Sequence, residues 1–219
     1  MPMLEVIEAA DCCNWRRSIR EANGTHSSLS SFLRYAEIQN LSPESTYHVG
    51  TLYEYTTLEA LQTAARMQLE RCGGAGDLGI DLRGTMRLAS AETKTIPVVV
   101  QCKSEKKKPG SRHIRELEGA SANSSANTLA VLAARLPVTD AAKRAMLSSA
   151  RPMSFCLVTS YDEGGRIQQM IWNAAAEKLL SGLTVVQITQ KPKKARGKKS
   201  LTESEGSNLP SIALIPVNR

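Results

Sequence analysis

The hydrophobic residues between positions 51 and 71 recur with the spacing of a helix. Leu52, Tyr55 and Leu69 fall on one face of a 3.6-residue period. Two consecutive glycines, at positions 73 and 74, follow this segment and disfavour its continuation. The pattern therefore predicts a helix over Thr51–Arg71.

Two short apolar stretches after this helix predict strands over Ile80–Leu88 and Ile96–Gln101. The second contains three consecutive valines, a continuous β-branched run that is typical of a strand buried on both faces. A further helix is expected over Ser111–Ala122. Ser111 would cap its N-terminus, and Ile114 with its apolar neighbours would face the core.

The C-terminal half alternates between the two kinds of pattern. The expected elements are a loop followed by an Ala-rich helix in residues 121–147, a strand at Ser154–Ser160, a helix at Arg166–Leu180, a strand at Leu183–Thr189 and an edge strand at Ile212–Val217. Helices that alternate with buried strands predict an α/β fold with a mixed central sheet flanked by helices.

The same patterns divide the chain into three parts. Residues 1–45 form an N-terminal helical extension or a targeting segment, residues 46–190 form the main domain, and residues 191–219 form a basic tail with an edge strand. Arg, Ser and Leu before Asn40 would suit a mitochondrial address, but the five acidic residues there are atypical of a presequence. The favoured interpretation is a helical extension that packs on the domain.

Composition narrows the classes of protein that remain. A hydrophobic content of 42% in 219 residues suffices for one core, whereas 4% aromatics argue against a base-stacking RNA-recognition surface. Five cysteines without a CxxC motif argue against a disulfide framework or a Cys-rich zinc site, and favour a reducing compartment. No apolar run approaches the roughly 18 residues of a membrane span, and no secretory signal is evident.

Positive charge favours a polyanionic partner. The net charge is +7, and the pI is about 9.3. Six of the 28 basic residues lie in the run Lys191–Lys199, which leaves 22 against 21 acids elsewhere. This run is compatible with a solvated tail, a non-specific DNA contact or a nuclear localisation signal.

Residues that could bind a metal ion follow the glycine-rich turn GGAGDLG, which begins at position 73. Asp81 enters a strand in an apolar setting, where an unpaired carboxylate is costly and a bound cation removes the cost. Gln101 and Lys103 are two residues apart on the next strand, so both point to one face. Oxygen donors from Asp81 and Gln101 suit Mg²⁺ or Mn²⁺. Lys103 could orient the attacking water or stabilise the phosphate charge.

Further polar residues surround this stretch. Glu54, on the preceding helix, could bind the metal through water or orient the nucleophile, and Asp77 is a spare carboxylate. Basic side chains and a helix N-terminus beyond the strand would meet a phosphate backbone. The predicted nucleic-acid contacts are Lys106, Lys107, Lys108, Arg112, His113 and Arg115.

Four motifs of the chain carry a family resemblance. The motifs HVGTLYEY, GGAGDLGIDLRG, VVVQCK and HIRELEGA together resemble the Mrr-like branch of the PD-(D/E)XK, or restriction-endonuclease-like, nucleases. In that branch a Gln replaces the usual acid of the last motif, which gives QxK. More narrowly, the combination resembles a fungal mitochondrial family named for its requirement in respiratory growth. The resemblance is tight over His48–Gly119 and loose beyond it.

The resemblance implies an αβββαβ core within residues 46–190, a divalent metal, DNA as substrate and a mitochondrial location. By motif position it assigns Glu54 to the first-helix acid, Asp81 to the strand acid, and Gln101 with Lys103 to the QxK pair. Many nucleases of this fold cut as homodimers, although the sequence identifies no dimer surface. The expected function is metal-dependent hydrolysis of phosphodiester bonds in DNA, in mitochondrial DNA maintenance.

Several alternatives stay open at the level of sequence. Asp81 and Lys103 could form a buried ion pair without any function, and Glu54 could be a solvated helix residue. The glycine-rich turn precedes a strand, whereas phosphate-cradling loops precede a helix, so nucleotide binding is disfavoured. Gln101 is a weaker ligand than Glu, which admits a catalytically weak or inactive nucleic-acid-binding factor. An RNA-processing nuclease and a nuclear location also remain.

Overall fold

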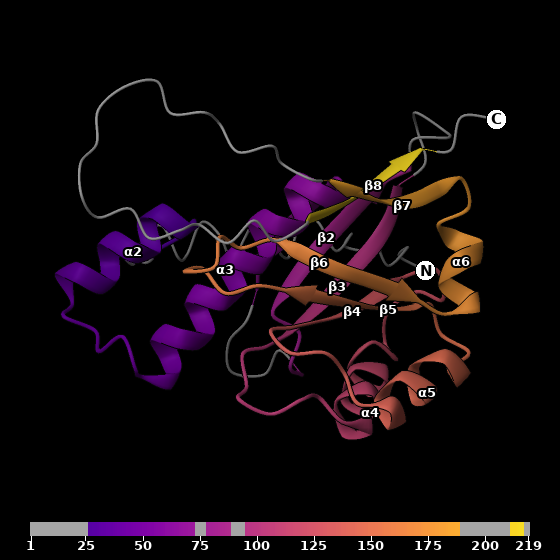
Figure 1. The fold of residues 1–219 in the computed structure, drawn as a ribbon, viewed down its shortest axis with the longest axis horizontal. Helices are drawn as coiled ribbons and strands as arrows, with labels where there is room; N and C mark the ends of the chain where they lie inside the picture. The colour runs from indigo at the N-terminus through magenta and orange to yellow at the C-terminus, as the bar shows by residue number, and fades with distance from the viewer. Residues whose placement is uncertain (1–25, 73–77, 89–94, 189–210, 217–219) are drawn as a thin grey trace, which may run out of the picture.

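The fold is built around one six-stranded sheet with helices on both faces (Figure 1). The structure, a computed structural model, describes residues 26–72, 78–88, 95–188 and 211–216. The elements in chain order are α2 (Leu29–Ile38), α3 (Thr46–Ala65), β1 (Met67–Arg71), β2 (Leu82–Arg87), β3 (Thr95–Lys103), α4 (Ser111–Ala120), β4 (Leu129–Ala134), α5 (Asp140–Ser148), β5 (Met153–Val158), β6 (Ile167–Trp172), α6 (Ala174–Leu179), β7 (Leu183–Ile188) and β8 (Ser211–Pro216).

The six strands lie in the order of the chain, from β1 to β6. Strands β1, β2 and β3 form an antiparallel meander, β3, β4 and β5 are parallel, and β6 returns antiparallel to β5. The parallel pairs require crossovers, which α4 and α5 provide. The prediction of an α/β fold with a mixed central sheet is therefore confirmed.

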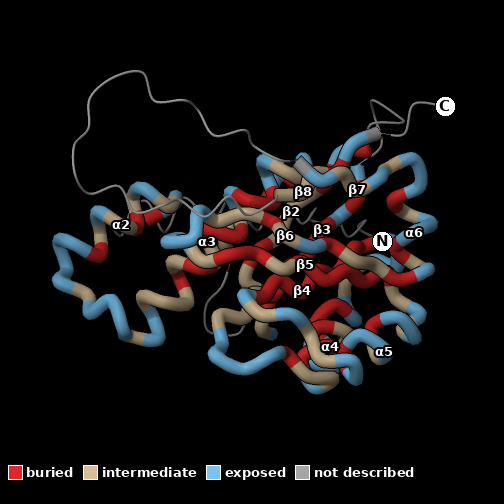
Figure 2. The backbone as a smooth tube through the Cα atoms, viewed as in Figure 1, coloured by how far each residue is buried: buried red, intermediate tan, exposed pale blue. Residues whose placement is uncertain are grey.

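Two apolar clusters fill the two faces of this sheet. On one face, α3 packs on the sheet through Tyr53, Leu61 and Ala65, together with residues of α6 and β8. On the other face, Ile114 and Leu117 of α4 pack with residues of α5. The central strands β4 and β5 are buried between these layers, as Figure 2 shows.

The N-terminal helix α2 packs on the exposed side of α3. A small cluster of Phe32, Ala36 and Tyr55 joins the two helices, and the buried His26 contacts the hydroxyls of Tyr55 and Tyr47 at 2.9 and 3.0 Å. This geometry is consistent with a helical extension, although residues 1–25 lie outside the described part of the chain. The proposed division at residues 45 and 190 stays a prediction.

The helix predicted to reach Arg71 ends earlier. Helix α3 ends at Ala65, and Arg66 takes a left-handed conformation with φ 52°. The following residues form β1, in which Met67 and Leu69 are buried and Gln68 is exposed. The prediction failed here because a buried–exposed–buried strand of five residues also matches part of a helical period. The helix also begins five residues before the predicted start, at Thr46.

Residues 121–147, predicted as a loop and an Ala-rich helix, contain an unexpected strand. Strand β4 is LAVLAA, and all six of its residues are buried. Leucine and alanine favour helices in isolation, but burial between two helical layers and pairing on both edges override that preference. The helical part of this stretch is α5 alone, capped by the Thr139 hydroxyl, which accepts from the Ala142 amide.

The helix predicted over Arg166–Leu180 is also divided. Its first half is β6, which pairs with β5 as a hairpin across a turn that contains Gly164 and Gly165, both with positive φ. Its second half is the short helix α6, which begins after Asn173. The isolated hydrophobics of IQQMIW satisfied a helical period, but the glycines before them direct the chain into a hairpin.

The predictions of five strands and of the helix after β3 were confirmed. The strands expected at Ile80–Leu88, Ile96–Gln101, Ser154–Ser160 and Leu183–Thr189 correspond to β2, β3, β5 and β7. The expected edge strand is β8, which pairs with β7 in a separate two-stranded sheet. Helix α4 is present, but Gly110 rather than Ser111 is its N-cap. Among the helices that are described, none is long and apolar enough to cross a membrane.

Candidate functional site

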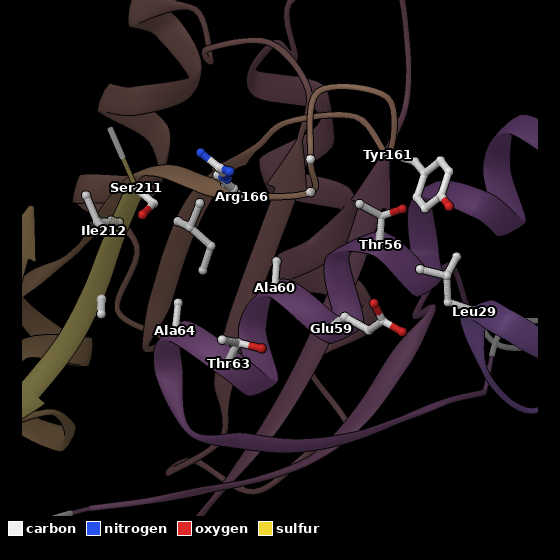
Figure 3. Close-up of a pocket in the computed structure, with 14 residues that line it drawn as sticks. Leu29, Thr56, Glu59, Ala60, Thr63, Ala64, Tyr161, Arg166, Ser211 and Ile212 are labelled. Carbon is white, nitrogen blue, oxygen red and sulfur yellow. The ribbon is translucent and has the colours of Figure 1, made fainter. Parts of the chain in front are cut away.

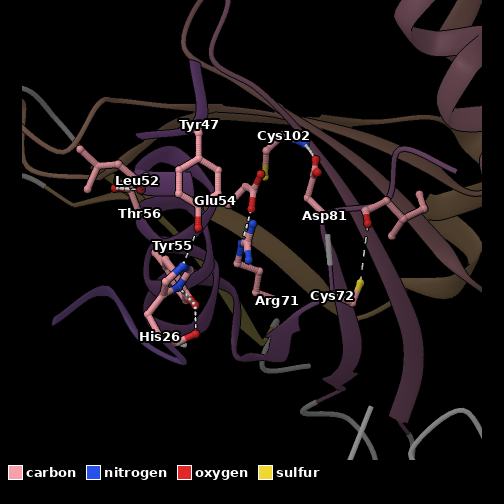
Figure 4. Close-up of polar contacts among 11 residues, drawn as sticks. His26, Tyr47, Leu52, Glu54, Tyr55, Thr56, Arg71, Cys72, Asp81 and Cys102 are labelled. Atoms are coloured by element: carbon pink, nitrogen blue, oxygen red, sulfur yellow. Dashed lines mark hydrogen bonds and ion pairs between the residues drawn. The ribbon is translucent and has the colours of Figure 1, made fainter. Parts of the chain in front are cut away.

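Glu54 points from α3 toward the end of β1, where it meets Arg71. Oε2 of Glu54 accepts a hydrogen bond from Nε of Arg71, and both side chains are mostly buried (Figure 4). Burial alone would lower the pKa of Arg71, but the charge of Glu54 and their hydrogen bond outweigh burial and raise it. The guanidinium also lies 5.7 Å from the centre of the Tyr55 ring. Glu54 is therefore a partnered, well-fixed carboxylate.

Asp81 is fixed between β2 and β3. Its amide donates to the Val100 carbonyl at 2.9 Å, and its Oδ2 accepts from the Cys102 amide at 2.6 Å. A backbone N–H that binds a carboxylate favours the charged form. Asp81 directly follows the glycine-rich turn as predicted, but residues 73–77, including the spare carboxylate Asp77, lie outside the described residues.

Gln101 differs from the other three predicted site residues in having a buried side-chain oxygen without a described partner. The residue is 3% exposed, and its Oε1 has no hydrogen-bond partner in the described part of the chain. Its Nε2 lies against Gly79, where an added Cβ would come within 2.8 Å. Gly79 has φ +80°, so a larger residue would be disfavoured by its backbone as well as by this contact. A buried acceptor without a partner costs about 1–3 kcal/mol, which a bound cation or water would offset.

Lys103 extends to helix α4. Its Nζ lies 3.9 Å from Oε2 of Glu116, and the other oxygen of Glu116 accepts from Nε of Arg112 at 3.1 Å. The side chain of Lys103 is 23% exposed and that of Glu116 is 41% exposed. This ion pair is long and partly solvated, so its attraction is weak. Lys103 can therefore leave Glu116 for a phosphate.

The four predicted residues divide between the two faces of β3. Val99 packs in the cluster with α4 and α5, so the alternation of the strand places Gln101 and Lys103 on that face as well. Cys102 packs on the opposite face, toward α3. Glu54 comes from α3, and Asp81 bonds the backbone of the strand between the two faces.

Cys102 lies between the two carboxylates, as Figure 4 shows. Burial raises the pKa of its thiol well above the usual value, and the negative charges of Asp81 and Glu54 raise it further. The thiol therefore stays protonated at neutral pH, which argues against Cys102 as a thiolate nucleophile or a thiolate ligand. Figure 4 places Glu54 and Asp81 on either side of Cys102, at the end of β3.

The predicted phosphate-binding residues differ in exposure. Five of them are exposed on the loop after β3 and on α4, namely Lys106, Lys107, Lys108, Arg112 and Arg115. His113 is only 6% exposed. Its Nδ1 accepts from the Gly110 amide at 3.1 Å, and its Nε2 lies 3.2 Å from Oε1 of Glu105. Both ring nitrogens are thus engaged in holding the loop, which leaves His113 poorly placed for a phosphate.

The donor set fits a hard cation only in part. Within the described residues, no group of three or more His, Cys, Asp or Glu side chains is arranged to hold a metal ion. Asp81 and Gln101 nevertheless contribute an anionic and a neutral oxygen, the donor types that Mg²⁺ and Mn²⁺ prefer. The unpartnered Oε1 of Gln101 is the observation that supports such a role. The residues therefore fit a metal that keeps several waters.

Two hollows lie away from these four residues. One, of about 430 Å³, lies between α3, the β5–β6 turn and β8, with Arg166, Tyr161 and Glu59 in its wall (Figure 3). The other, of about 1040 Å³, follows the edge formed by β1 and β2 and reaches Arg71. Glu54, Asp81, Gln101 and Lys103 line neither hollow. The candidate site is instead defined by its contacts at the end of β3.

Sequence reasoning missed two charged partners of this site. Arg71 was placed in a helix, where it would not have faced Glu54; its position in β1 brings the two together. Glu116 was not singled out, although its spacing of four residues from Arg112 on a predicted helix indicated an ion pair. Its contact with Lys103 depends on the crossover that lays α4 against β3, which the sequence pattern alone does not specify.

Known proteins resemble this chain at three levels. The family described as "Required for respiratory growth protein 7" matches residues 45–95 and 86–188. An uncharacterized mitochondrial protein of Schizosaccharomyces pombe is 34% identical over 174 residues, which are 80% of this chain and 70% of that protein. Among solved structures, MspJI restriction endonuclease in complex with a 27-mer oligonucleotide has a TM-score of 0.38 and 12% identity. The match covers 70% of this chain and 32% of that one, and at this score it carries no argument.

The two sequence matches settle location and family. A mitochondrial relative and a family required for respiratory growth confirm the predicted mitochondrial location. The family match spans most of the described domain, including α3, the β1–β3 meander and the strands that follow. The chain therefore belongs to the family described as Required for respiratory growth protein 7.

Proposed function

We propose that this mitochondrial protein is a Mg²⁺- or Mn²⁺-dependent nuclease that hydrolyses phosphodiester bonds in DNA, in the maintenance of mitochondrial DNA. The order α3-β1-β2-β3-α4-β4 supports the proposal, because an αβββαβ order is expected of a restriction-endonuclease-like core. The proposal assigns this core to residues 46–190. The observation that carries the proposal is the buried Oε1 of Gln101, which has no hydrogen-bond partner among the described residues and lies one residue from the backbone amide that binds Asp81.

The residues at the end of β3 have distinct roles in this proposal. Asp81 and Gln101 hold the cation, which when bound makes hydroxide accessible near neutral pH and polarises the phosphoryl oxygen. Lys103 releases Glu116 and donates to the phosphate, where negative charge grows in the transition state. Glu54, fixed by Arg71, orients a water from the α3 side.

The DNA backbone would approach over the loop after β3. Lys106, Lys107 and Lys108 are exposed there, and Arg112 and Arg115 continue the positive surface along α4. Each phosphate contact releases counterions, so binding should weaken steeply with salt. The amide groups at the start of α4 add partial positive charge on the same side of the molecule.

Neutralising the loop tests this surface. Replacement of Lys106, Lys107 and Lys108 by Gln should weaken DNA binding and reduce the slope of log K against log[salt] by about 2 to 3, because each phosphate contact contributes about 0.9. Fluorescence anisotropy at several salt concentrations measures both quantities. The control changes three exposed basic residues elsewhere, Arg34, Arg87 and Lys178, to Gln. Equal losses in the two triple variants would refute a localised surface.

Cleavage by the purified full chain tests the function itself. Single-stranded, duplex, branched and flap DNA, with matching RNA, should be incubated with Mg²⁺, Mn²⁺ or EDTA. We expect products from at least one DNA substrate with a divalent metal and none with EDTA. Salt-sensitive binding without cleavage of any substrate would overturn the nuclease assignment in favour of a non-cleaving nucleic-acid-binding factor. Preferential cleavage of RNA would instead change the substrate.

A further inference from the structure

Among the described residues, the proposed metal site carries little negative charge. Asp81 contributes one carboxylate and Gln101 a neutral oxygen, while Lys103 adds a positive charge two residues away. A divalent cation beside one carboxylate and one ammonium is poorly compensated, because affinity for hard cations rises with the number of charged ligands. A second carboxylate on the same face of β3 would correct this balance.

Glu116 lies on that face. Helix α4 packs against the side of the sheet to which Gln101 and Lys103 point, and Glu116 reaches Lys103 Nζ at 3.9 Å. Its carboxylate lies between two cations, Lys103 and Arg112, and is 41% exposed. Both of these cations are phosphate ligands in the proposed function. Glu116 therefore loses its partners when they turn to DNA, and it becomes available to a metal.

Glu54 is the competing carboxylate, and its environment is less suitable. It belongs to α3, on the opposite face of the sheet from Gln101. Its partner Arg71 is partly buried with it, packs over Tyr55 and has no proposed phosphate to turn to. Removal of Glu54 from Arg71 would leave a largely buried guanidinium without its acid, which is costly.

We propose that Glu116, rather than Glu54, supplies the second carboxylate of the metal site, so that α4 provides the charge that Gln101 lacks. This inference rests on the proposed function and adds a ligand to it. The buried Oε1 of Gln101, which has no partner among the described residues, marks the position of the cation. The loose contact of Glu116 with Lys103 places a movable carboxylate two residues along the same face of β3.

Metal binding by the full chain tests the assignment without reference to activity. Isothermal titration with Mn²⁺ should give a measurable affinity for the wild type and for Glu54→Gln, which should agree within about twofold. Glu116→Gln should bind Mn²⁺ about tenfold or more weakly, because one charged ligand is lost. Far-ultraviolet circular dichroism and the thermal midpoint verify that both variants are folded.

A double-mutant cycle separates a ligand from a residue that merely holds Lys103. In a Lys103→Met background, Glu116→Gln should still weaken Mn²⁺ binding by about tenfold, because a charged ligand is lost whether or not Lys103 is present. A carboxylate that only positions Lys103 would have no further effect in that background. Absence of an effect of Glu116→Gln in Lys103→Met would overturn the assignment.

The remaining outcomes distinguish the inference from the function on which it rests. Wild-type affinity in Glu116→Gln, with weak binding in Glu54→Gln, would overturn the role of Glu116 and leave the metal site intact. Absence of Mn²⁺ binding in the wild type would overturn the metal site, and the nuclease proposal with it.

Discussion

Asp81→Asn should lower the rate of metal-dependent cleavage by about 100- to 1,000-fold, because it removes a charged ligand of the proposed cation. Asparagine has nearly the same shape, and its Oδ1 can still accept the hydrogen bond that the Cys102 amide donates to Asp81 at 2.6 Å. The loss should therefore come from charge and not from misfolding. Single-turnover kinetics on the best substrate, with excess enzyme, measure the chemical step.

The matched control is Asp162→Asn, which makes the same chemical change at an exposed turn. It should cleave at the wild-type rate. DNA affinity measured in EDTA should be unchanged or slightly increased in Asp81→Asn, since a negative charge is removed from a phosphate-binding surface. Equal rates for Asp81→Asn and the wild type, at every metal concentration, would show that Asp81 is not a metal ligand.

Asn173→Ala should destabilise the fold by about 3–4 kcal/mol, since it leaves several buried groups without partners. Asn173 is 1% exposed. Its Oδ1 accepts from the amides of Met153, at the start of β5, and Ala176, at the start of α6. Its Nδ2 donates to three carbonyls, at 2.8 to 3.2 Å: those of Met146, Ser149 and Arg151.

This single amide therefore joins α5, β5 and α6. For a domain of this size the predicted loss corresponds to a fall of roughly 10 °C in Tm, measurable by calorimetry or circular dichroism. Asn173→Asp should be at least as destabilising, because it keeps the acceptor but directs a carboxylate at the three carbonyls. Asn127→Ala, at an exposed position, should stay within about 0.5 kcal/mol of the wild type.

The sequence allowed the mixed α/β fold and the strand that carries the site to be predicted, but it did not allow every strand of the sheet to be predicted. Three consecutive valines and two polar residues after them indicated a buried strand with chemistry at its end, and β3 has that form. The buried strand β4 could not be predicted, because its Leu and Ala residues favour a helix unless two layers cover them. The spacing of hydrophobic residues along the sequence depends on local structure. Which strands lie between two layers of helices is set by tertiary packing.

The same limit applies within the site. The spacing of Gln101 and Lys103 placed both on one face, and the packing of Val99 and Glu116 agrees with this. The pairing of Glu54 with Arg71 depended on the end of α3 at Ala65. A helix six residues longer, as predicted, would have carried Arg71 away from Glu54. To predict contacts between residues far apart in the sequence, one must know how the chain folds in three dimensions. The hydrophobic pattern of the sequence does not contain that information.

The topology of the sheet also bears on the order in which the protein acquires its site. The elements from α3 to α4 contribute Glu54, Asp81, Gln101 and Glu116, and β1, β2 and β3 meet through sequence-local antiparallel pairing. Such contacts form faster than the parallel pairing of β3 with β4, which needs a crossover. The chain thus brings its chemical groups together early, but Gln101 becomes buried only when Leu132 of β4 pairs beside it. A nascent chain would therefore bring Asp81 and Gln101 together in a solvated site, and Glu116 would join them only when β4 docks and α4 packs on the sheet.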